Sequence, residues 1–483
     1  MKKSILKALQ SAIEGEVYTK KEFKNFYSVD ASSYQIIPKI VVIPKNEKDV
    51  INTVKIAKKF KTSVTVRGAG TSLVGNALNN GIIVDMKNFD SFRLAKNHIT
   101  AGPGMIKGIL DKKLEGKRKF FPPNPSIGSF CAVGGMLGNN ASGSRSLKYG
   151  SMIDNVIEIT FIDGNGNKIV LPQNKKVGKK ILEFANKIDF DKFPNVTKNS
   201  SGYRIDKVKS IKDSHKLIIG SEGTLGIIIS AKLKIQNEPK KRILFVIEYD
   251  SITRASKNCI EINKTNPSAI EFVDKTTLNQ IKTKFNKKTK CLLFVEYDEN
   301  IISNEKKLKT ILTGIIVKKL EKNYDMLQWW RYRESSLHYS LRSIKKEKRI
   351  PHVIEDAAVP LENFPKLFLL LNKINKKYKT KAIVYGHAGN ANVHVRLIAD
   401  RKKMYIVKNI AIKYFDEIIK LGGTITAEHG DGLARSEFIK KQYGVKNYHV
   451  FKEIKKFFDP KNILNPGKII TKKSTITKNL ENF

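Results

Sequence analysis

Cysteine is scarce in this sequence, which has three cysteines among 483 residues: Cys131, Cys259 and Cys291. They lie far apart and form no Cys-x-x-Cys pair. They therefore supply neither a disulfide framework nor the ligand pattern of an iron–sulfur cluster. Scarce, unpaired cysteine is typical of a reducing compartment, so we expect a cytoplasmic protein.

Long apolar runs are also missing. No stretch approaches the roughly 20 apolar residues that a transmembrane helix needs. Residues 1–3 resemble the charged start of a signal peptide, but Lys7 interrupts the apolar run that should follow. Apolar side chains at helical spacing instead predict an amphipathic first helix, with one side formed by Ile5, Leu6, Leu9 and Ile13.

Acidic residues are in deficit, with 45 Asp and Glu against 90 Lys and Arg, and the net charge is +45. Only 14 of the basic residues are arginines, and the lysines are spread along the whole chain. Together with the abundant Ile and Asn, this pattern is typical of an AT-rich genome. A nucleic-acid binder would cluster its arginines among aromatic residues, so we expect no nucleic-acid partner. The charge favours acidic partners or peripheral contact with an anionic membrane.

The length and the 41% hydrophobic content predict two or three domains with full cores. Short, largely apolar runs predict strands at 39–43, 64–66, 82–85 and 227–229, and the segment 156–171 predicts a hairpin that turns at 163–166. Asn46 is placed to cap a helix that runs to about Phe60. The composition shifts to a linker at 236–241, and a turn-rich segment spans 459–467. Between them, strands at 243–247 and 291–295 alternate with Lys-rich helices.

Three loops of small residues lie in the first half, at 67–75, 121–150 and 220–226. Glycine and serine let the backbone approach a ligand and point N–H groups at its phosphates. The first loop has the spacing GxGxxxxG, which is neither a Rossmann turn nor a nucleoside-triphosphate loop. One such loop is often a mere turn, whereas three predict a large, extended ligand.

Two later loops, 386–394 and 427–432, hold three of the eight histidines beside a glutamate. Imidazole and carboxylate are common ligands of a divalent metal with an open position. From spacing alone, ordinary surface or core histidines remain an alternative. The stretch 393–397 alternates like a strand, which puts His394 and Arg396 on one face.

The loops at 66–73, 134–150 and 221–226, in this order, resemble those of the vanillyl-alcohol-oxidase-type FAD proteins. The later loops resemble the C-terminal domain of one branch of FAD-linked oxidases. That branch holds D-lactate dehydrogenases, the glycolate oxidase flavin subunit and D-2-hydroxyglutarate dehydrogenases. The resemblance covers about residues 36 to 468.

The resemblance implies an α+β fold with a two-part FAD-binding domain, a ferredoxin-like substrate domain and a C-terminal helical segment that returns to the flavin. The implied boundaries are an N-terminal helical segment at 1–35, the FAD-binding domain at 36–238, the substrate domain at 239–415, the returning segment at 416–470 and a polar tail at 471–483.

The resemblance also carries over a set of FAD contacts, namely Arg67, Gly68, Gly70, Thr71, Ser72, Gly75, Pro122, Gly134, Gly135, Asn139, Ser142, Gly143, Glu222, Gly226, Ile227 and Asn465. Members with covalent flavin usually have a histidine in the first loop. That loop has none here, so we expect non-covalent FAD. Cys131 is the other conceivable linkage, but its apolar, small-residue surroundings favour packing.

The two later loops imply a divalent metal, zinc or manganese, on His387, His394 and Glu428. His429 matches the residue that takes the substrate hydroxyl proton, and Arg333 matches an arginine that clamps the substrate carboxylate. Arg396 is a second candidate for binding that carboxylate. An arginine at this position resembles a subgroup of relatives that are fused to an iron–sulfur domain. Relatives have an aspartate where this chain has Asn390-Ala391, so one carboxylate near the metal loop is lost.

The implied function is FAD-dependent oxidation of a D-2-hydroxyacid of the D-lactate, glycolate or D-2-hydroxyglutarate type to the 2-oxoacid. Electrons would pass to a separate acceptor: an iron–sulfur subunit, a cytochrome, an electron-transfer flavoprotein or a quinone. One alternative is another flavin enzyme of the same fold, such as an alcohol oxidase or alkyl transferase, although those lack the two histidine loops. The other is a basic, non-enzymatic binding protein.

Overall fold

The first sheet contains the strands that the sequence predicts before residue 90, at 39–43, 64–66 and 82–85. In the computed structural model, which describes residues 4–278, 285–336, 348–349, 351–400, 405–476 and 478–479, this sheet has the order β1-β2-β4-β3. Strands β2 and β3 run parallel to β4, and β1 is an antiparallel edge. The strands are β1 (Glu16–Tyr18), β2 (Ile40–Ile43), β3 (Val64–Arg67) and β4 (Ile82–Asp85).

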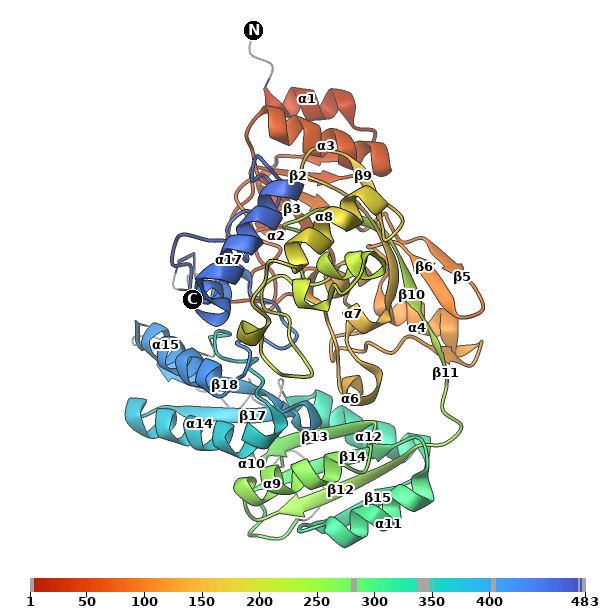
Figure 1. The fold of residues 1–483 in the computed structure, drawn as a ribbon, viewed down its shortest axis with the longest axis vertical. Coiled ribbons are helices and arrows are strands. Elements are labelled where there is room, and N and C mark those ends of the chain that lie inside the picture. Colours follow the sequence, from red (N-terminus) through yellow and green to blue (C-terminus); the bar gives the residue numbers. More distant parts are fainter. Residues whose placement is uncertain are drawn as a thin grey trace.

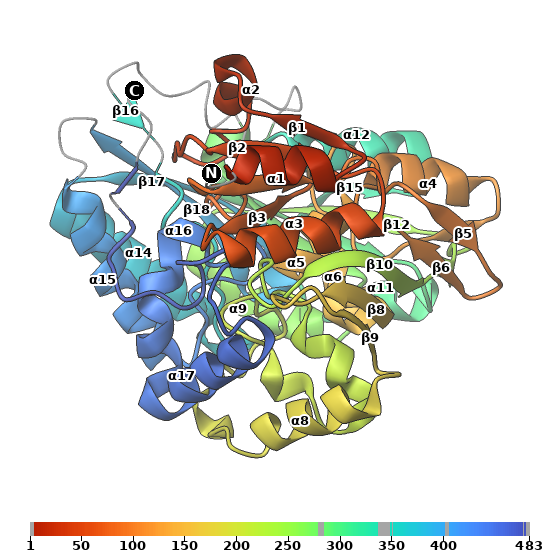
Figure 2. The same cartoon turned by 90° about the horizontal axis from the view of Figure 1, so that it is seen from above.

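Two helices cover this sheet, α1 (Ile5–Ala12) and α3 (Glu47–Lys59) (Figure 2). The expected cap of α3 is present, because the Asn46 side chain accepts a hydrogen bond from the Asp49 N–H at 3.0 Å. Leu9 of α1 is fully buried in the same core as the sheet. The predicted opening helix and the predicted cap are therefore both confirmed.

A second, five-stranded antiparallel sheet has the order β5-β6-β10-β8-β9. The predicted hairpin is its β8–β9 pair, in which Ile162 lies opposite Lys168. Its strands are β5 (Phe92–Leu94), β6 (His98–Ala101), β8 (Val156–Ile162), β9 (Lys168–Leu171) and β10 (Ile227–Lys234). The expected linker differs in one respect: its first two residues form β11 (Gln236–Asn237), which pairs with β7 (Lys119–Phe120).

The second half of the chain, from residue 243 on, contains a seven-stranded sheet with the order β15-β12-β14-β13-β17-β18-β16. Its strands are β12 (Ile243–Tyr249), β13 (Ala269–Asp274), β14 (Cys291–Tyr297), β15 (Ile315–Leu320), β16 (Lys348–Arg349), β17 (Lys381–His387) and β18 (Asn392–Asp400). In Figure 1 this sheet lies below the first half, and the chain crosses between the two from β11 to β12.

The central strands are apolar on both faces because helices cover both. One face packs against the helices α9 (Ile252–Asn263), α14 (Phe364–Tyr378) and α15 (Tyr405–Lys420). The opposite face packs against α12 (Asn323–Glu334) through Trp329 and Trp330. Burial on both sides explains the continuous apolar runs. The α+β class expected from the sequence is confirmed.

The end of the chain returns to the first half. Helix α17 (Ile439–Phe458) shares a core with the second sheet and lies beside α8 (Lys175–Ala185) in both views (Figures 1 and 2). Leu464 then forms a parallel bridge with Val64 of β3. The turn-rich segment therefore lies directly behind the first glycine-rich loop. Of the expected polar tail, residues 477 and 480–483 lie outside the described residues.

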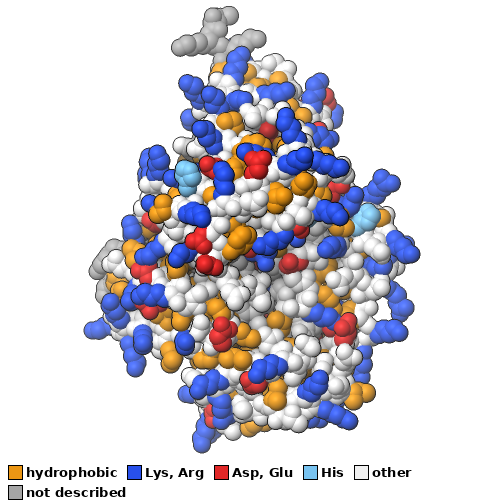
Figure 3. All heavy atoms as spheres, in the orientation of Figure 1, with side chains coloured by type: hydrophobic (Ala, Val, Ile, Leu, Met, Phe, Trp, Pro, Cys, Tyr) orange, Lys and Arg blue, Asp and Glu red, His pale blue; other side chains and the backbone are white. Residues whose placement is uncertain are grey.

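Basic side chains are spread over the whole face shown in Figure 3 and alternate with acidic and apolar ones. This scatter fits the even distribution of lysine along the sequence. None of the described helices is both long enough and apolar enough to cross a membrane.

The return of α17 predicts a strong dependence of stability on Phe451, whose side chain is fully buried. Its ring packs edge-on against Tyr203 of the first half, with 5.4 Å between ring centroids. Phe451→Ala should lower the free energy of unfolding by about 3–5 kcal/mol, measured by urea titration with far-UV circular dichroism. Val445→Ala on the same helix, where the side chain is 71% exposed, should change it by less than about 0.5 kcal/mol. Equal effects would show that α17 is not part of this core.

Candidate functional site

One elongated cavity of about 520 Å³ joins the two halves of the molecule. Its volume lies in the range of small-molecule and cofactor sites. At one end it is lined by the three small-residue loops of the first half. At the other end it is lined by charged and imidazole side chains from the second half of the chain, namely Arg333, His387, His394, Arg396, Glu428 and His429.

Most of the predicted FAD contacts line the loop end of this cavity: Arg67, Gly68, Gly70, Thr71, Ser72, Gly134, Gly135, Asn139, Ser142, Glu222 and Gly226. The N-terminal segment supports them from outside. Arg67 donates a hydrogen bond to the Val29 carbonyl at 2.8 Å, and Ala31 itself lines the cavity. No motif before residue 36 indicates that this segment belongs to the site.

Five predicted FAD contacts do not line the cavity: Gly75, Pro122, Gly143, Ile227 and Asn465. Asn465 lies behind it, where its amide donates to the carbonyls of Asn76 and Glu222 at 2.9 and 2.7 Å. It thereby ties the first loop to the third. A Cβ on Gly75 would come within 2.8 Å of Leu433. In the structure these two residues pack the loops, and their direct contact with a cofactor stays a prediction.

The two histidine loops come together through the β17–β18 hairpin. His387 ends β17, and His394 lies opposite Tyr385 in β18. The predicted alternation is confirmed, because Val393, Val395 and Leu397 enter the core while His394 and Arg396 line the cavity. The position where relatives have an aspartate is used differently here: Asn390 donates to Thr197 and accepts from Ser146 in the first half, at 2.8 and 3.1 Å.

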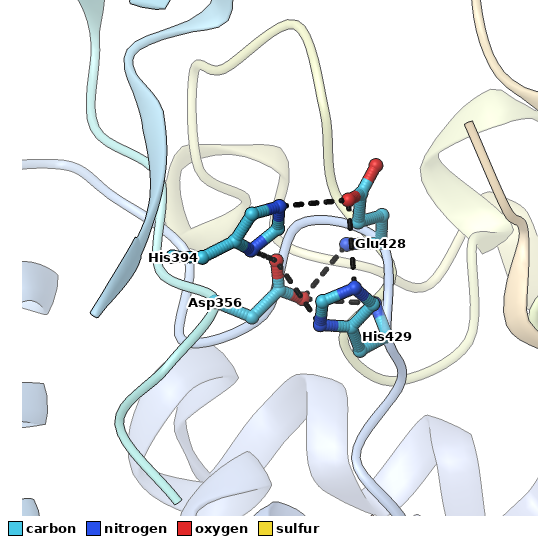
Figure 4. A group of neighbouring side chains, drawn as sticks. All are labelled: Asp356, His394, Glu428 and His429. Atoms are coloured by element: carbon cyan, nitrogen blue, oxygen red, sulfur yellow. Dashed lines mark hydrogen bonds and ion pairs between the residues drawn. The ribbon is translucent and has the colours of Figure 1, made fainter. Parts of the chain in front are cut away.

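The Nε2 atoms of three histidines converge on one carboxylate oxygen, Oε1 of Glu428. The distances are 3.1 Å from His387, 3.3 Å from His394 and 3.5 Å from His429. Figure 4 shows His394, Glu428 and His429 close together, with Asp356 facing the loop that carries the last two. Residues far apart in the sequence thus supply one compact set of donor atoms.

Two of these imidazoles are held from behind by carboxylates. The Nδ1 of His387 lies 2.7 Å from Glu271, and that of His429 lies 2.9 Å from Glu355. A carboxylate at Nδ1 favours the tautomer that carries its proton there and leaves the Nε2 lone pair free for a metal. Both carboxylates lie outside the motifs that single out the histidines.

Asp356 is a further residue that the sequence does not reveal. Together with His394, Glu428 and His429, it offers a set of ligand atoms within 4.8 Å of one another. However, its Oδ2 already accepts hydrogen bonds from the backbone N–H groups of Ala427, Glu428 and His429, at 3.0, 2.9 and 2.8 Å. Asp356 therefore holds the loop in shape, and its other oxygen, Oδ1, accepts a hydrogen bond from the Asn392 amide at 3.3 Å.

Within the predicted set, the two distances from histidine Nε2 to Oε1 of Glu428, 3.1 Å for His387 and 3.3 Å for His394, suit a divalent metal. Ligand atoms about 2.1 Å from one tetrahedral ion lie roughly 3.4 Å apart, close to the two histidine distances. Two Nε2 atoms and a carboxylate oxygen that face one another need either a proton on a ring nitrogen or a cation among them. The set of neighbouring ligand atoms contains His394 and Glu428 of the predicted ligands but not His387, and the role of all three as metal ligands stays a prediction.

Burial and neighbouring charges shift the pKa values in this cluster in different directions. Burial lowers the pKa of His394 to about 4. For Glu428, burial opposes ionisation, but above all the charge of Lys198 holds its pKa well below the ordinary value. Burial also opposes protonation of His429, yet the carboxylates of Glu355 and Asp356 raise its pKa to about 9. A divalent cation nearby would lower that pKa by repulsion.

The two predicted arginines occupy different environments. Arg333 directs Nε and one terminal nitrogen at the same oxygen of Glu271, each at 2.6 Å. Arg396 donates from Nε to the Tyr385 hydroxyl at 2.9 Å, and its buried Nη1 has no hydrogen-bond partner among the described residues. This Nη1 lies 3.7 Å from Glu355, so Arg396 is held less closely by a carboxylate than Arg333, and both arginines line the cavity.

Comparison with protein families gives two matches along the chain. Residues 38–171 match the family described as FAD binding domain, and residues 238–469 match FAD linked oxidases, C-terminal domain. The first match contains the first two small-residue loops. The second contains both histidine loops.

Individual proteins match over almost the whole chain. The glycolate oxidase subunit GlcD of Bacillus subtilis is 28% identical, with 92% of each chain covered. The D-lactate dehydrogenase of Archaeoglobus fulgidus is 27% identical, covering 90% of this chain and 91% of its own. The D-2-hydroxyglutarate dehydrogenase of Haemophilus influenzae is also 27% identical, but this chain spans only 50% of that protein.

Among solved structures, alkyldihydroxyacetonephosphate synthase superposes with a TM-score of 0.68 over 96% of this chain and 85% of its own. The sequence identity is 18%, so this likeness shows a shared fold alone.

Proposed function

Because the chain belongs to the FAD-linked oxidases, we propose that it oxidises a D-2-hydroxyacid to the 2-oxoacid and passes the electrons to a separate acceptor. The observation that carries this proposal is the single cavity in which the FAD loops and the imidazole–carboxylate cluster face each other. Relatives named glycolate oxidase, D-lactate dehydrogenase and D-2-hydroxyglutarate dehydrogenase support the substrate class. A purely binding role finds no support among these relatives.

The proposed catalytic roles follow from the geometry. Arg396, which lines the cavity, binds the substrate carboxylate, since a guanidinium suits a carboxylate. His429 faces the cluster with Nε2 and takes the hydroxyl proton there, while Glu355 holds its Nδ1. His387, His394 and Glu428 would hold a divalent metal, zinc or manganese, which acidifies a bound hydroxyl. Bound FAD supplies the acceptor for the hydride from the substrate carbon.

We propose that the FAD is held without a covalent bond. The first loop contains no histidine, and burial raises the pKa of the Cys131 thiol to about 11, which keeps it from being a reactive thiolate at neutral pH. Acid precipitation should therefore leave all flavin in the supernatant, and Cys131→Ser should retain the wild-type flavin content. Flavin in the pellet of the wild type, but not of the variant, would identify Cys131 as a linkage.

His429→Ala should leave flavin binding intact and slow flavin reduction by about a hundredfold or more, the usual scale for loss of a general base. Stopped-flow absorbance at a saturating substrate concentration measures this rate. His387→Ala should act through metal affinity instead, so added Mn²⁺ or Zn²⁺ should restore part of its activity and none of that of His429→Ala. If His429→Ala reduced its flavin at the wild-type rate, another group would accept the hydroxyl proton.

Substitutions of Arg396 and Arg333 should change different kinetic constants. Arg396→Met removes the proposed carboxylate partner, and losses of this type typically cost about 2–5 kcal/mol, which should appear mainly as a higher KM. Arg333→Met should act mainly on kcat, because Arg333 faces Glu271 and Glu271 holds His387. Steady-state kinetics on the accepted acid distinguish the two. Unchanged kinetics in Arg396→Met would remove Arg396 from the site.

The electron acceptor is proposed to be a separate protein or a quinone, because the three cysteines are free, buried and unsuited to a second redox centre. Candidates are an iron–sulfur subunit, a cytochrome, an electron-transfer flavoprotein or a quinone at the inner face of a membrane. The positive charge would favour an acidic partner.

A panel of D- and L-2-hydroxyacids should give rapid reduction of an artificial dye with a D-acid and slow turnover with oxygen. With the natural acceptor, turnover should fall as salt is raised. Rapid, stoichiometric formation of peroxide in air without dye would make the protein an oxidase and contradict this assignment.

A further inference from the structure

Lys198 is a buried lysine in the first half whose partner belongs to the histidine cluster. Its side chain is 1% exposed, and its Nζ lies 3.0 Å from Oε2 of Glu428, 230 positions later in the chain. It lies in the irregular segment between the short helices Phe190–Lys192 and Ile205–Lys207. It carries no part of the motifs that single out the cavity.

Ser142 approaches the same carboxylate oxygen. Its hydroxyl donates to Oε2 of Glu428 at 2.5 Å, and Ser142 itself lines the cavity in the second small-residue loop. Both partners of Oε2 therefore come from the FAD-binding half. The other oxygen, Oε1, faces the Nε2 atoms of His387 and His394, which lie in the second half of the chain.

This division fixes the rotation of the carboxylate. An ammonium and a hydroxyl on one oxygen satisfy it with two charge-assisted hydrogen bonds, which are shorter and stronger than neutral ones. The second oxygen is left to point at the imidazoles. Without Lys198, the buried Glu428 would keep its charge with one donor fewer and could turn away from the histidines.

We propose that Lys198 is a positioning residue for the divalent metal, which it affects by holding Oε2 of Glu428 so that Oε1 faces His387 and His394. This inference rests on the proposed function, because it presumes a metal on those three side chains. It also links the halves, since Glu428 is held by the FAD-binding half and completes a site on the β17–β18 hairpin. Lys198 does not line the cavity.

The test is the affinity of the purified flavoprotein for Mn²⁺ and Zn²⁺, measured by titration after chelation and dialysis. Lys198→Met should weaken binding about 10- to 100-fold, the usual effect of losing a group that orients a metal ligand. Lys198→Gln, which can still donate a hydrogen bond, should lie between it and the wild type. At saturating metal, both variants should regain most of their kcat, which a misfolded site would not do.

Lys107→Met is the matched control, because Lys107 is also buried and pairs with one carboxylate, Asp111, at 2.5 Å. It should match the wild type in metal affinity even if its melting temperature falls. If Lys198→Met is insoluble, Lys198→Gln decides the matter. Wild-type affinity in the soluble Lys198 variants would overturn the role of Lys198 alone, whereas no metal binding by the wild-type protein would remove the metal site and this inference together.

Discussion

The pairing of buried charges at the end of the cavity is the constraint on which the rest of the structure depends. An isolated charge in such a place is strongly unfavourable, and removal of one partner of a buried ion pair typically costs about 3–5 kcal/mol. The chain meets this constraint with an ionic cluster of four acids and four bases, all buried: Glu271, Glu355, Asp356, Glu428, Lys198, Arg333, Arg396 and Arg435. Glu355 shows the principle, because it holds Arg435 at 2.5 Å and His429 at 2.9 Å.

The same constraint sets the relative placement of the two halves. Further ion pairs cross the interface beside the cavity, where Arg145 meets Glu296 at 2.6 Å and Lys148 meets Asp298 at 2.7 Å. Glu222 in the third loop accepts from the N–H groups of Asp431 and Gly432, at 2.5 and 3.0 Å. A cofactor on the loops is thereby held at a fixed distance from the imidazoles. Such alignment contributes much of the rate of a bimolecular step.

The sequence predicted the parts of this site that carry a local pattern. The strand alternation of 393–397 put His394 and Arg396 on one face, and the glycine-rich loops marked the other end of the cavity. It missed Lys198, Glu271 and Glu355, because a single charged residue in an ordinary strand or loop has no signature. These residues become partners only when the chain folds, and their separations from His387, Glu428 and His429 run from 74 to 230 positions. Asn465 shows the opposite case. The resemblance predicts it as an FAD contact, yet in the structure its side chain joins two loops from behind the cavity.

The charge count of the ionic cluster bears on the choice of substrate. Four carboxylates and four cationic side chains cancel, so the cluster carries no net charge when a bound metal keeps His429 neutral; without a metal, the raised pKa of His429 adds one positive charge. A divalent ion on His387, His394 and Glu428 would add two positive charges in a poorly hydrated place, where they are not screened as in water. A neutral alcohol would leave both charges uncompensated, whereas a 2-hydroxyacid brings a carboxylate next to an ionisable hydroxyl. The cluster therefore favours an anionic substrate by its charge as well as by the placement of Arg396. This preference applies to 2-hydroxyacids in general, and contacts with the rest of the substrate select among them.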